Sequence, residues 1–131
     1  MPLVLIVERD GSVRDLQRFF LERAGFAVEF ADDGLAAIAH VLRSPPALVV
    51  TEILVPKLDG LTLCRRLRDD PDTAHVPVVV FSILAAAMRA AEAGARAFLR
   101  KPIVEATFVA AVLGALATQP PATTEQPWAS R

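Results

Sequence analysis

Five short apolar runs punctuate the sequence, and helical patterns of apolar and polar residues fill the intervals between them. The runs carry little polar alternation, which is typical of strands covered on both faces, as in a parallel sheet. We expect strands at Leu3–Val7, Ala27–Ala31, Leu48–Thr51 and 77–82, with a fifth, weaker one at Ala97–Arg100.

The intervals predict five helices. The first is expected to begin at Ser12, with Asp15 three residues later as a partial capping box, and to stop at Gly25. The others are expected at 34–43, from Gly60 to about residue 69, at 84–93, and from Pro102 to about residue 117. Strands that alternate with helices predict an α/β fold with right-handed crossovers and a doubly wound parallel sheet of five strands.

Composition narrows the class of protein. The chain has 131 residues, 53% of them hydrophobic, which suits one domain with a real core. A net charge of -1 offers no basic field for nucleic acid, and no apolar run reaches the roughly 18 residues of a membrane span. The single cysteine, Cys64, excludes an internal disulfide, and His40 and His75 are expected at the surface rather than in a zinc site. We therefore expect a cytoplasmic domain that contacts neither nucleic acid nor membrane.

The last residues differ in composition from the rest. Residues 1–117 form the predicted domain, whereas 118–131 contain three prolines and a lone Trp128 among Thr, Gln and Ser. This composition predicts a flexible tail. A tether or docking segment is the alternative.

Chemically reactive residues gather where the predicted strands end. In a doubly wound sheet, function sits at the carboxyl ends of the strands. Two carboxylates, a hydroxyl and an ammonium converge there, together with an arginine and a further aspartate. The residues are Glu8, Arg9 and Asp10 after the first strand, Glu52 after the third, Ser82 in the fourth and Lys101 after the fifth.

An ordered set of segments resembles the response-regulator receiver domain of two-component signalling. The segments are LVLIVERD (3–10), GFAVEFADDG (25–34), ALVVTEILVPKLDGLTLCRRLR (47–68), PVVVFS (77–82) and AGARAFLRKP (93–102). The resemblance covers about residues 2–117. It implies a CheY-like, flavodoxin-like (βα)5 fold with strand order 2-1-3-4-5. It also implies a histidine kinase as phosphoryl donor.

The resemblance implies a role for each residue at the strand ends. Glu52 stands where the family has its phosphoacceptor aspartate, and Glu8 and Arg9 stand where two acidic residues help to hold Mg²⁺. The main-chain carbonyl of Leu54 would complete the metal shell. The remaining positions are the switch hydroxyl at Ser82, the rotating aromatic at Phe98 and the family's lysine at Lys101.

Two departures from the family pattern fall on the chemistry. Glu52 carries its carboxylate one methylene further out than aspartate, and a misplacement of about 1 Å can cost about 100-fold in rate. Arg9 is cationic and offers no acceptor, so it should repel Mg²⁺. Asp10 could supply a replacement carboxylate, but we expect it to point elsewhere. The sequence therefore predicts weak or lost Mg²⁺ binding, no other cofactor and no metal-dependent phosphoryl relay.

The charges at this edge can balance without a metal. We expect Arg9 to stand in for Mg²⁺ and pair with Glu8 or Glu52, and Lys101 to pair with Glu52. The longer Glu52 side chain could then reach Ser82, as a phosphoryl oxygen does in the family. This arrangement would bias the domain toward an active-like state.

The segment between Ser82 and Lys101 is shorter than the family usually has, so the loop or first turn before the fourth helix should be trimmed. Ile83, a bulky residue after the switch position, could obstruct the pocket. The fourth and fifth helices are poor in charge, which predicts a partner or homodimer surface across them. The alternative is that their many alanines simply tolerate exposure.

Three functions compete at this point. The leading hypothesis is a stand-alone, non-enzymatic pseudo-receiver that acts through protein–protein contacts. The second is a working phospho-receiver that accepts a phosphoryl group on Glu52 or Asp10. The third, a small α/β enzyme or nucleotide binder, is disfavoured because the first strand is followed by no G-x-G-x-x-G motif and the chain has no P-loop.

Overall fold

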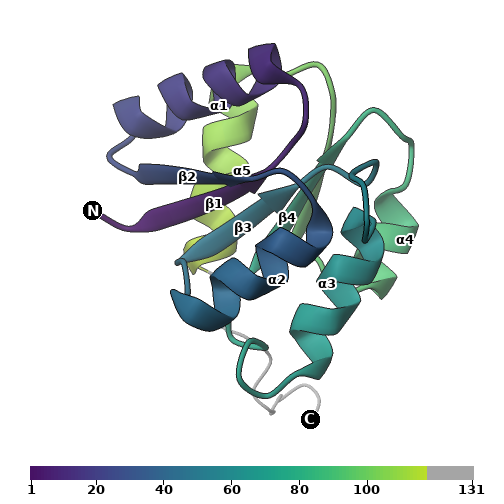
Figure 1. Cartoon of the computed structure of the whole chain (residues 1–131). Helices are drawn as coiled ribbons and strands as arrows, with labels where there is room; N and C mark the ends of the chain where they lie inside the picture. The colour runs from purple at the N-terminus through teal and green to yellow at the C-terminus, as the bar shows by residue number, and fades with distance from the viewer. Residues whose placement is uncertain (118–131) are drawn as a thin grey trace, which may run out of the picture.

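The computed structural model describes residues 1–117 and consists of five strands that alternate with five helices (Figure 1). All the strand pairs are parallel, in the order β2-β1-β3-β4-β5. The predicted fold class and strand order are confirmed. The elements are β1 (Leu3–Val7), α1 (Gly11–Arg23), β2 (Ala27–Ala31), α2 (Gly34–Arg43), β3 (Leu48–Thr51), α3 (Gly60–Asp69), β4 (Val78–Ser82), α4 (Ala87–Glu92), β5 (Ala97–Arg100) and α5 (Glu105–Ala117).

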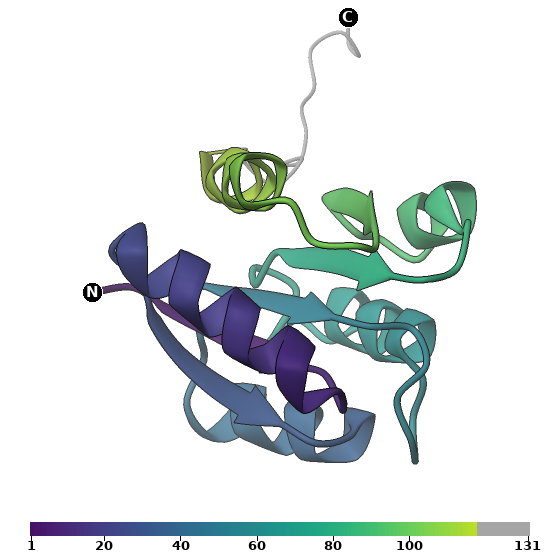
Figure 2. The same cartoon turned by 90° about the horizontal axis from the view of Figure 1, so that it is seen from above.

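Helices cover both faces of the sheet (Figure 2). Leu21 of α1 and Phe108 of α5 pack on one face, whereas Val41 of α2 and Leu67 of α3 pack on the other together with residues of α4. Successive residues of β1 alternate between the two buried clusters. This arrangement explains why the central strands read as continuous apolar runs rather than as an alternating pattern.

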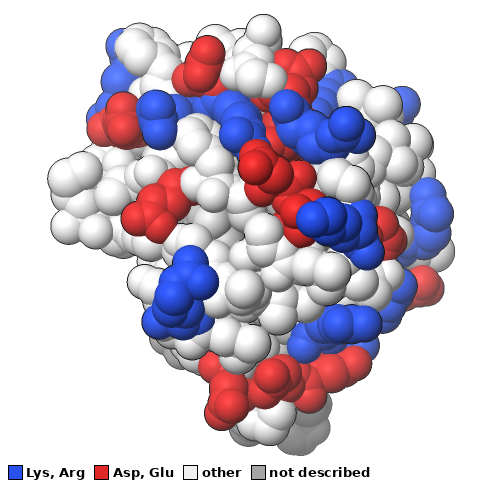
Figure 3. All heavy atoms as spheres, in the orientation of Figure 1, with Lys and Arg blue, Asp and Glu red and all other residues white. Residues whose placement is uncertain are grey.

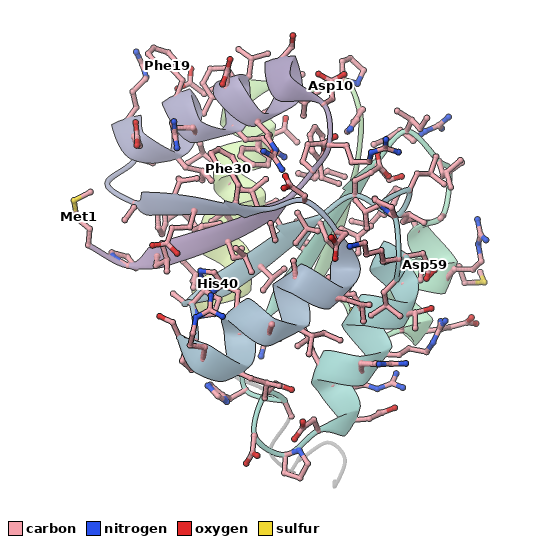
Figure 4. All side chains as sticks on the ribbon, viewed as in Figure 1. Met1, Asp10, Phe19, Phe30, His40 and Asp59 are labelled. Carbon is pink, nitrogen blue, oxygen red and sulfur yellow. The ribbon has the colours of Figure 1, made fainter. Side chains whose placement is uncertain are left out.

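The start of α1 differs from the prediction. The helix begins at Gly11, and its N-cap is Asp10, whose Oδ1 accepts hydrogen bonds from the main-chain N–H groups of Ser12 (2.9 Å) and Val13 (3.2 Å). Figure 4 shows Asp10 at this end of α1. The predicted Ser12 and Asp15 capping box was wrong because Asp10, three residues after the end of β1, caps the helix earlier.

The fourth helix is shorter than the predicted 84–93. It spans Ala87–Glu92 and has no side-chain N-cap. The main-chain N–H groups of Ile83 and Leu84 donate to the side chains of Glu52 and Ser82, and the chain enters the helix only after Ala86. The helix therefore starts three residues later than its apolar pattern predicted.

The predictions for the burial of Cys64 and His40 had opposite outcomes. Cys64 is buried in the core, as expected for α3. His40 was expected at the surface but is only 8% exposed, with Nε2 2.5 Å from Oε1 of Glu29 on β2 (Figure 4). This prediction was wrong because the face of α2 that carries His40 packs on the sheet.

The predicted tail, 118–131, lies outside the described residues. Within residues 1–117, no helix has the length and apolar character needed to cross a bilayer.

The turn between β3 and α3 brings two segments of backbone into close contact. Gly60, the first residue of α3, lies against the main chain of Glu52, and its N–H donates to the carbonyl of Ile53 (2.8 Å). A Cβ at Gly60 would overlap the Glu52 carbonyl oxygen and lie 2.9 Å from the carbonyl carbon. Gly60 therefore lets α3 start directly beneath the residue at the centre of the strand-end cluster.

We expect Gly60→Ala to lower the free energy of unfolding by about 1–3 kcal/mol, because the added methyl collides with backbone that cannot swing aside. Gly11→Ala is the matched control, since a Cβ there meets nothing within 4 Å. The control should be neutral or stabilising by up to about 1 kcal/mol. Urea denaturation of both variants measures the difference, and equal stabilities would contradict the close-contact argument.

Candidate functional site

Lys101 lies between two buried carboxylates at the carboxyl edge of the sheet. Its Nζ is 2.9 Å from Oε1 of Glu8 and 3.0 Å from Oε2 of Glu52. Glu8 is 3% exposed and Glu52 5%. The predicted pair between Lys101 and Glu52 is present, and the contact with Glu8 adds a second carboxylate that the sequence did not predict. One ammonium thus pairs with both carboxylates that two different strands bring into the interior.

Five donors surround the Glu52 carboxylate. The main-chain N–H groups of Ile53 (2.6 Å) and Leu54 (3.2 Å) donate to Oε1, which also accepts a short hydrogen bond from Oγ of Ser82. Oε2 faces Lys101 and accepts from the N–H of Ile83 (3.3 Å). A carboxylate offers about four lone-pair sites, so the capacity of Glu52 is filled.

This environment sets the ionisation of both partners. Burial by itself disfavours ionised Glu52, but the hydrogen bonds from Ser82, Lys101 and Leu54 and the charge of Lys101 outweigh it and lower the pKa of Glu52. Burial likewise disfavours charged Lys101, but Glu8 and Glu52 outweigh it and raise the pKa of Lys101. The cluster therefore holds the Glu52 carboxylate and the Lys101 ammonium in their charged forms at neutral pH.

Arg9 does not take the place of a metal ion. Its side chain is exposed and forms no ion pair with Glu8 or Glu52 in the part of the chain that the structure describes. The predicted pairing was wrong for two reasons. Glu8 turns inward at the end of β1, so the next residue turns outward, and Lys101 already lies between the two carboxylates.

Asp10 and Leu54 each contact the cluster through a main-chain N–H group. The Asp10 carboxylate caps α1 and points away from the cluster, as expected, while its N–H donates to Oε2 of Glu8 (3.2 Å). Leu54 donates its N–H to Glu52, and its side chain is 53% exposed. The Asp10 carboxylate therefore adds no oxygen to the cluster, and the metal-binding role of the Leu54 carbonyl stays a prediction.

The donor set does not suit Mg²⁺. This ion requires near-octahedral oxygen ligands, yet an ammonium lies between the two glutamates and the Glu52 oxygens are already occupied by donors. Within residues 1–117, no three His, Cys, Asp or Glu side chains are grouped so that they could hold a metal. Mg²⁺ would compete with Lys101 for Oε1 of Glu8 and Oε2 of Glu52.

The two residues that the resemblance assigns to switching both lie inward. Ser82 is fully buried; its Oγ donates to Glu52 and accepts from the N–H of Leu84 (3.2 Å). Phe98 of β5 is partly buried and packs on the cluster formed with α3 and α4. Ile83 is 54% exposed at the rim. The predicted contact between Glu52 and Ser82 is therefore present, and Phe98 is partly buried.

Two arginines that the sequence analysis overlooked hold the rim of the site. Arg14 donates Nε to the carbonyl of Glu8 (2.5 Å) and pairs with Asp32 after β2. Arg100 donates Nε to the carbonyl of Ile83 (2.7 Å). The sequence did hold a signal for Arg100: it is the last residue of β5 and directly precedes Lys101, so it lies at the same edge of the sheet.

Comparisons with known proteins agree with this architecture. The model of the response regulator receiver domain matches residues 4–113. The chain is 36% identical over 105 residues to the DNA-binding dual master transcriptional regulator RpaA of Synechocystis sp., a match that covers 78% of this chain and 44% of RpaA. It is 38% identical over 90 residues to the response regulator PleD of Caulobacter vibrioides, covering 66% of this chain and 20% of PleD. The chain thus spans less than half the length of these relatives.

Solved structures show the same fold. The crystal structure of the signal receiver domain of a signal transduction histidine kinase from Syntrophus aciditrophicus superposes with a TM-score of 0.83 at 29% identity, covering 96% of each chain. The fold and the family are therefore established together.

The Glu52 cluster predicts a specific pH dependence of stability. Because the folded pKa of Glu52 lies below its ordinary value of 4.5, its stabilisation is complete above pH 4.5 and is lost as the pH falls through the folded pKa. At pH 7, Glu52→Gln should lower the free energy of unfolding by about 2–4 kcal/mol. This difference should shrink steadily below pH 4.5.

Urea denaturation of both proteins from pH 3 to pH 8 measures the effect. Glu92→Gln, a change at an exposed position of α4, is the control and should stay within about 0.5 kcal/mol of the parent. A Glu52→Gln penalty that is the same at pH 3 and pH 7 would show that the ionised carboxylate is not what stabilises the cluster.

Proposed function

We propose, from the premise that this chain belongs to the response regulator receiver domain family, that it is a signalling module which works without Mg²⁺-dependent phosphorylation. In this proposal it catalyses no reaction and transmits its state through protein–protein contacts. Signalling proteins of the two-component type, including a histidine kinase, are the expected partners, and the cytoplasm is the expected location.

One observation carries the proposal: the Glu52 carboxylate is already fully engaged. Phosphoryl transfer depends on an accessible, positioned acceptor and on cations that neutralise the developing charge. Here Ser82, Ile83 and Lys101 hold the acceptor-position oxygens, and an exposed Arg9 replaces an acidic residue at the rim. Attack by Glu52 would require breaking this set of contacts first.

The same contacts support a standing active-like state. In the family, a phosphoryl group on the acceptor draws in the switch hydroxyl, as the resemblance implies. The extra methylene of Glu52 lets an unmodified carboxylate reach Oγ of Ser82 and the N–H of Ile83. The chain then holds by itself the contact that its relatives form only after modification.

A working phospho-receiver is the second candidate, and one observation favours it. Glu52 is ionised, since its pKa is lowered, and a carboxylate must be ionised to attack phosphorus. Asp10 is the weaker acceptor because its carboxylate is committed to the cap of α1. The two candidate functions differ in whether the Glu52 carboxylate can break its hydrogen bonds and become free to attack phosphorus.

The surface supports contact with proteins rather than with nucleic acid. Figure 3 shows acidic and basic side chains interspersed on one face, without a large area of a single sign. Met88 of α4 and Leu113 of α5 are 76% and 50% exposed. These apolar side chains support the partner or homodimer surface predicted across α4 and α5. The alternative stays that the many alanines of these helices simply tolerate exposure.

Phosphorylation in vitro separates the two candidates. After incubation with acetyl phosphate and Mg²⁺, we expect intact-mass measurement to find no phosphoryl adduct on the parent chain. The double variant Glu52→Asp with Arg9→Asp should gain an adduct, because it shortens the acceptor and supplies a metal-binding carboxylate. Either single variant should gain less.

Arg43→Asp, an exposed site on α2, combined with Glu52→Asp, controls for the change in net charge and should behave like the Glu52→Asp single variant. A stoichiometric adduct on the parent chain would overturn the proposal in favour of a working phospho-receiver.

A further inference from the structure

We infer that Arg100 is a positioning residue that holds the β4–α4 loop, residues 83–86, in its active-like arrangement. The inference rests on the proposed function, since it explains how that arrangement persists without a phosphoryl group. Neither Arg100 nor its contact belongs to the set of residues that the family resemblance assigns to the site.

The Ile83 residue is held from two sides. Its main-chain N–H donates to Oε2 of Glu52 (3.3 Å), and its carbonyl accepts from Nε of Arg100 (2.7 Å). Glu52 reaches the loop from β3 and Arg100 from the end of β5. Since β3 and β5 lie on opposite sides of β4, the loop that follows β4 is fastened to both of its neighbours.

The rest of the loop is held mainly by apolar packing, since Ala86 is buried in the core and Leu84 packs against it. The N–H of Leu84 donates to Oγ of Ser82, and α4 has no side-chain cap to anchor its start. Before the loop, Ser82 is paired in register with Arg100, and its carbonyl accepts from the N–H of Lys101. Arg100 therefore extends the β4–β5 pairing by one contact beyond the end of β4.

The two contacts differ in environment, and this difference assigns them different roles. Glu52 is buried, so its hydrogen bonds stabilise the whole domain, whereas Arg100 is exposed and its hydrogen bond competes with water. Arg100 should therefore govern local opening of the loop more than global unfolding. The half-exposed Ile83 side chain, which borders the rim of the site, is held in one place only while both contacts persist.

Hydrogen exchange of main-chain amides, followed by NMR on the full chain, tests the inference. Arg100→Ala should speed exchange at Ile83 and Leu84 by about 3- to 10-fold. Amides of β1 should exchange at the parent rate. Arg100→Lys, which keeps a shorter donor, should give a smaller increase, and the exposed Arg43→Ala control should give none.

A second comparison distinguishes loss of the Arg100–Ile83 contact from general loosening of the domain. In a Glu52→Gln background the loop has already lost its stronger fastening, so Arg100→Ala should speed exchange by a smaller factor than in the parent. Unchanged exchange at Ile83 and Leu84 in Arg100→Ala would overturn the inference, as would equal acceleration in β1. The phosphoryl-adduct measurement on the parent chain is independent of these results. Failure of the inference about Arg100 can therefore be told apart from failure of the proposed function.

Discussion

The contact on which the site depends is the ammonium of Lys101 between the carboxylates of Glu8 and Glu52. Two carboxylates brought into a nearly dry interior repel each other and lose hydration, so a cation must accompany them. The topology supplies it, because parallel strands deliver their carboxyl ends to one edge and Lys101 directly follows β5. Removing the ammonium would leave two buried carboxyl groups without their shared cation.

The internal cation also changes what the acceptor position can do. In receiver domains the resemblance implies that a metal ion and a phosphoryl group complete the charge and hydrogen-bond pattern of this edge. Here Lys101 pairs with both carboxylates, and the longer side chain of Glu52 reaches Ser82 and Ile83 directly. Binding of Mg²⁺ to the Glu52 oxygens would therefore have to break existing interactions before forming new ones.

Much of this architecture could be predicted from sequence, and the failures have physical reasons. Apolar runs defined the strands to within a residue, and the Lys101–Glu52 pair followed from their ends. The direction of the Arg9 side chain could not be predicted from its type, because strand geometry rather than charge turns it outward. The late start of α4 escaped notice because helical spacing does not show that the Glu52 and Ser82 side chains hold the preceding amides.

A crystal structure of the full chain grown in millimolar Mg²⁺ would show whether Lys101 or a metal ion holds Glu8 and Glu52. We expect Nζ of Lys101 to stay within hydrogen-bond distance of both glutamates, with no metal ion between them. A hexacoordinate Mg²⁺ bound to Glu8, Glu52 and the carbonyl of Leu54, with Lys101 displaced, would contradict it.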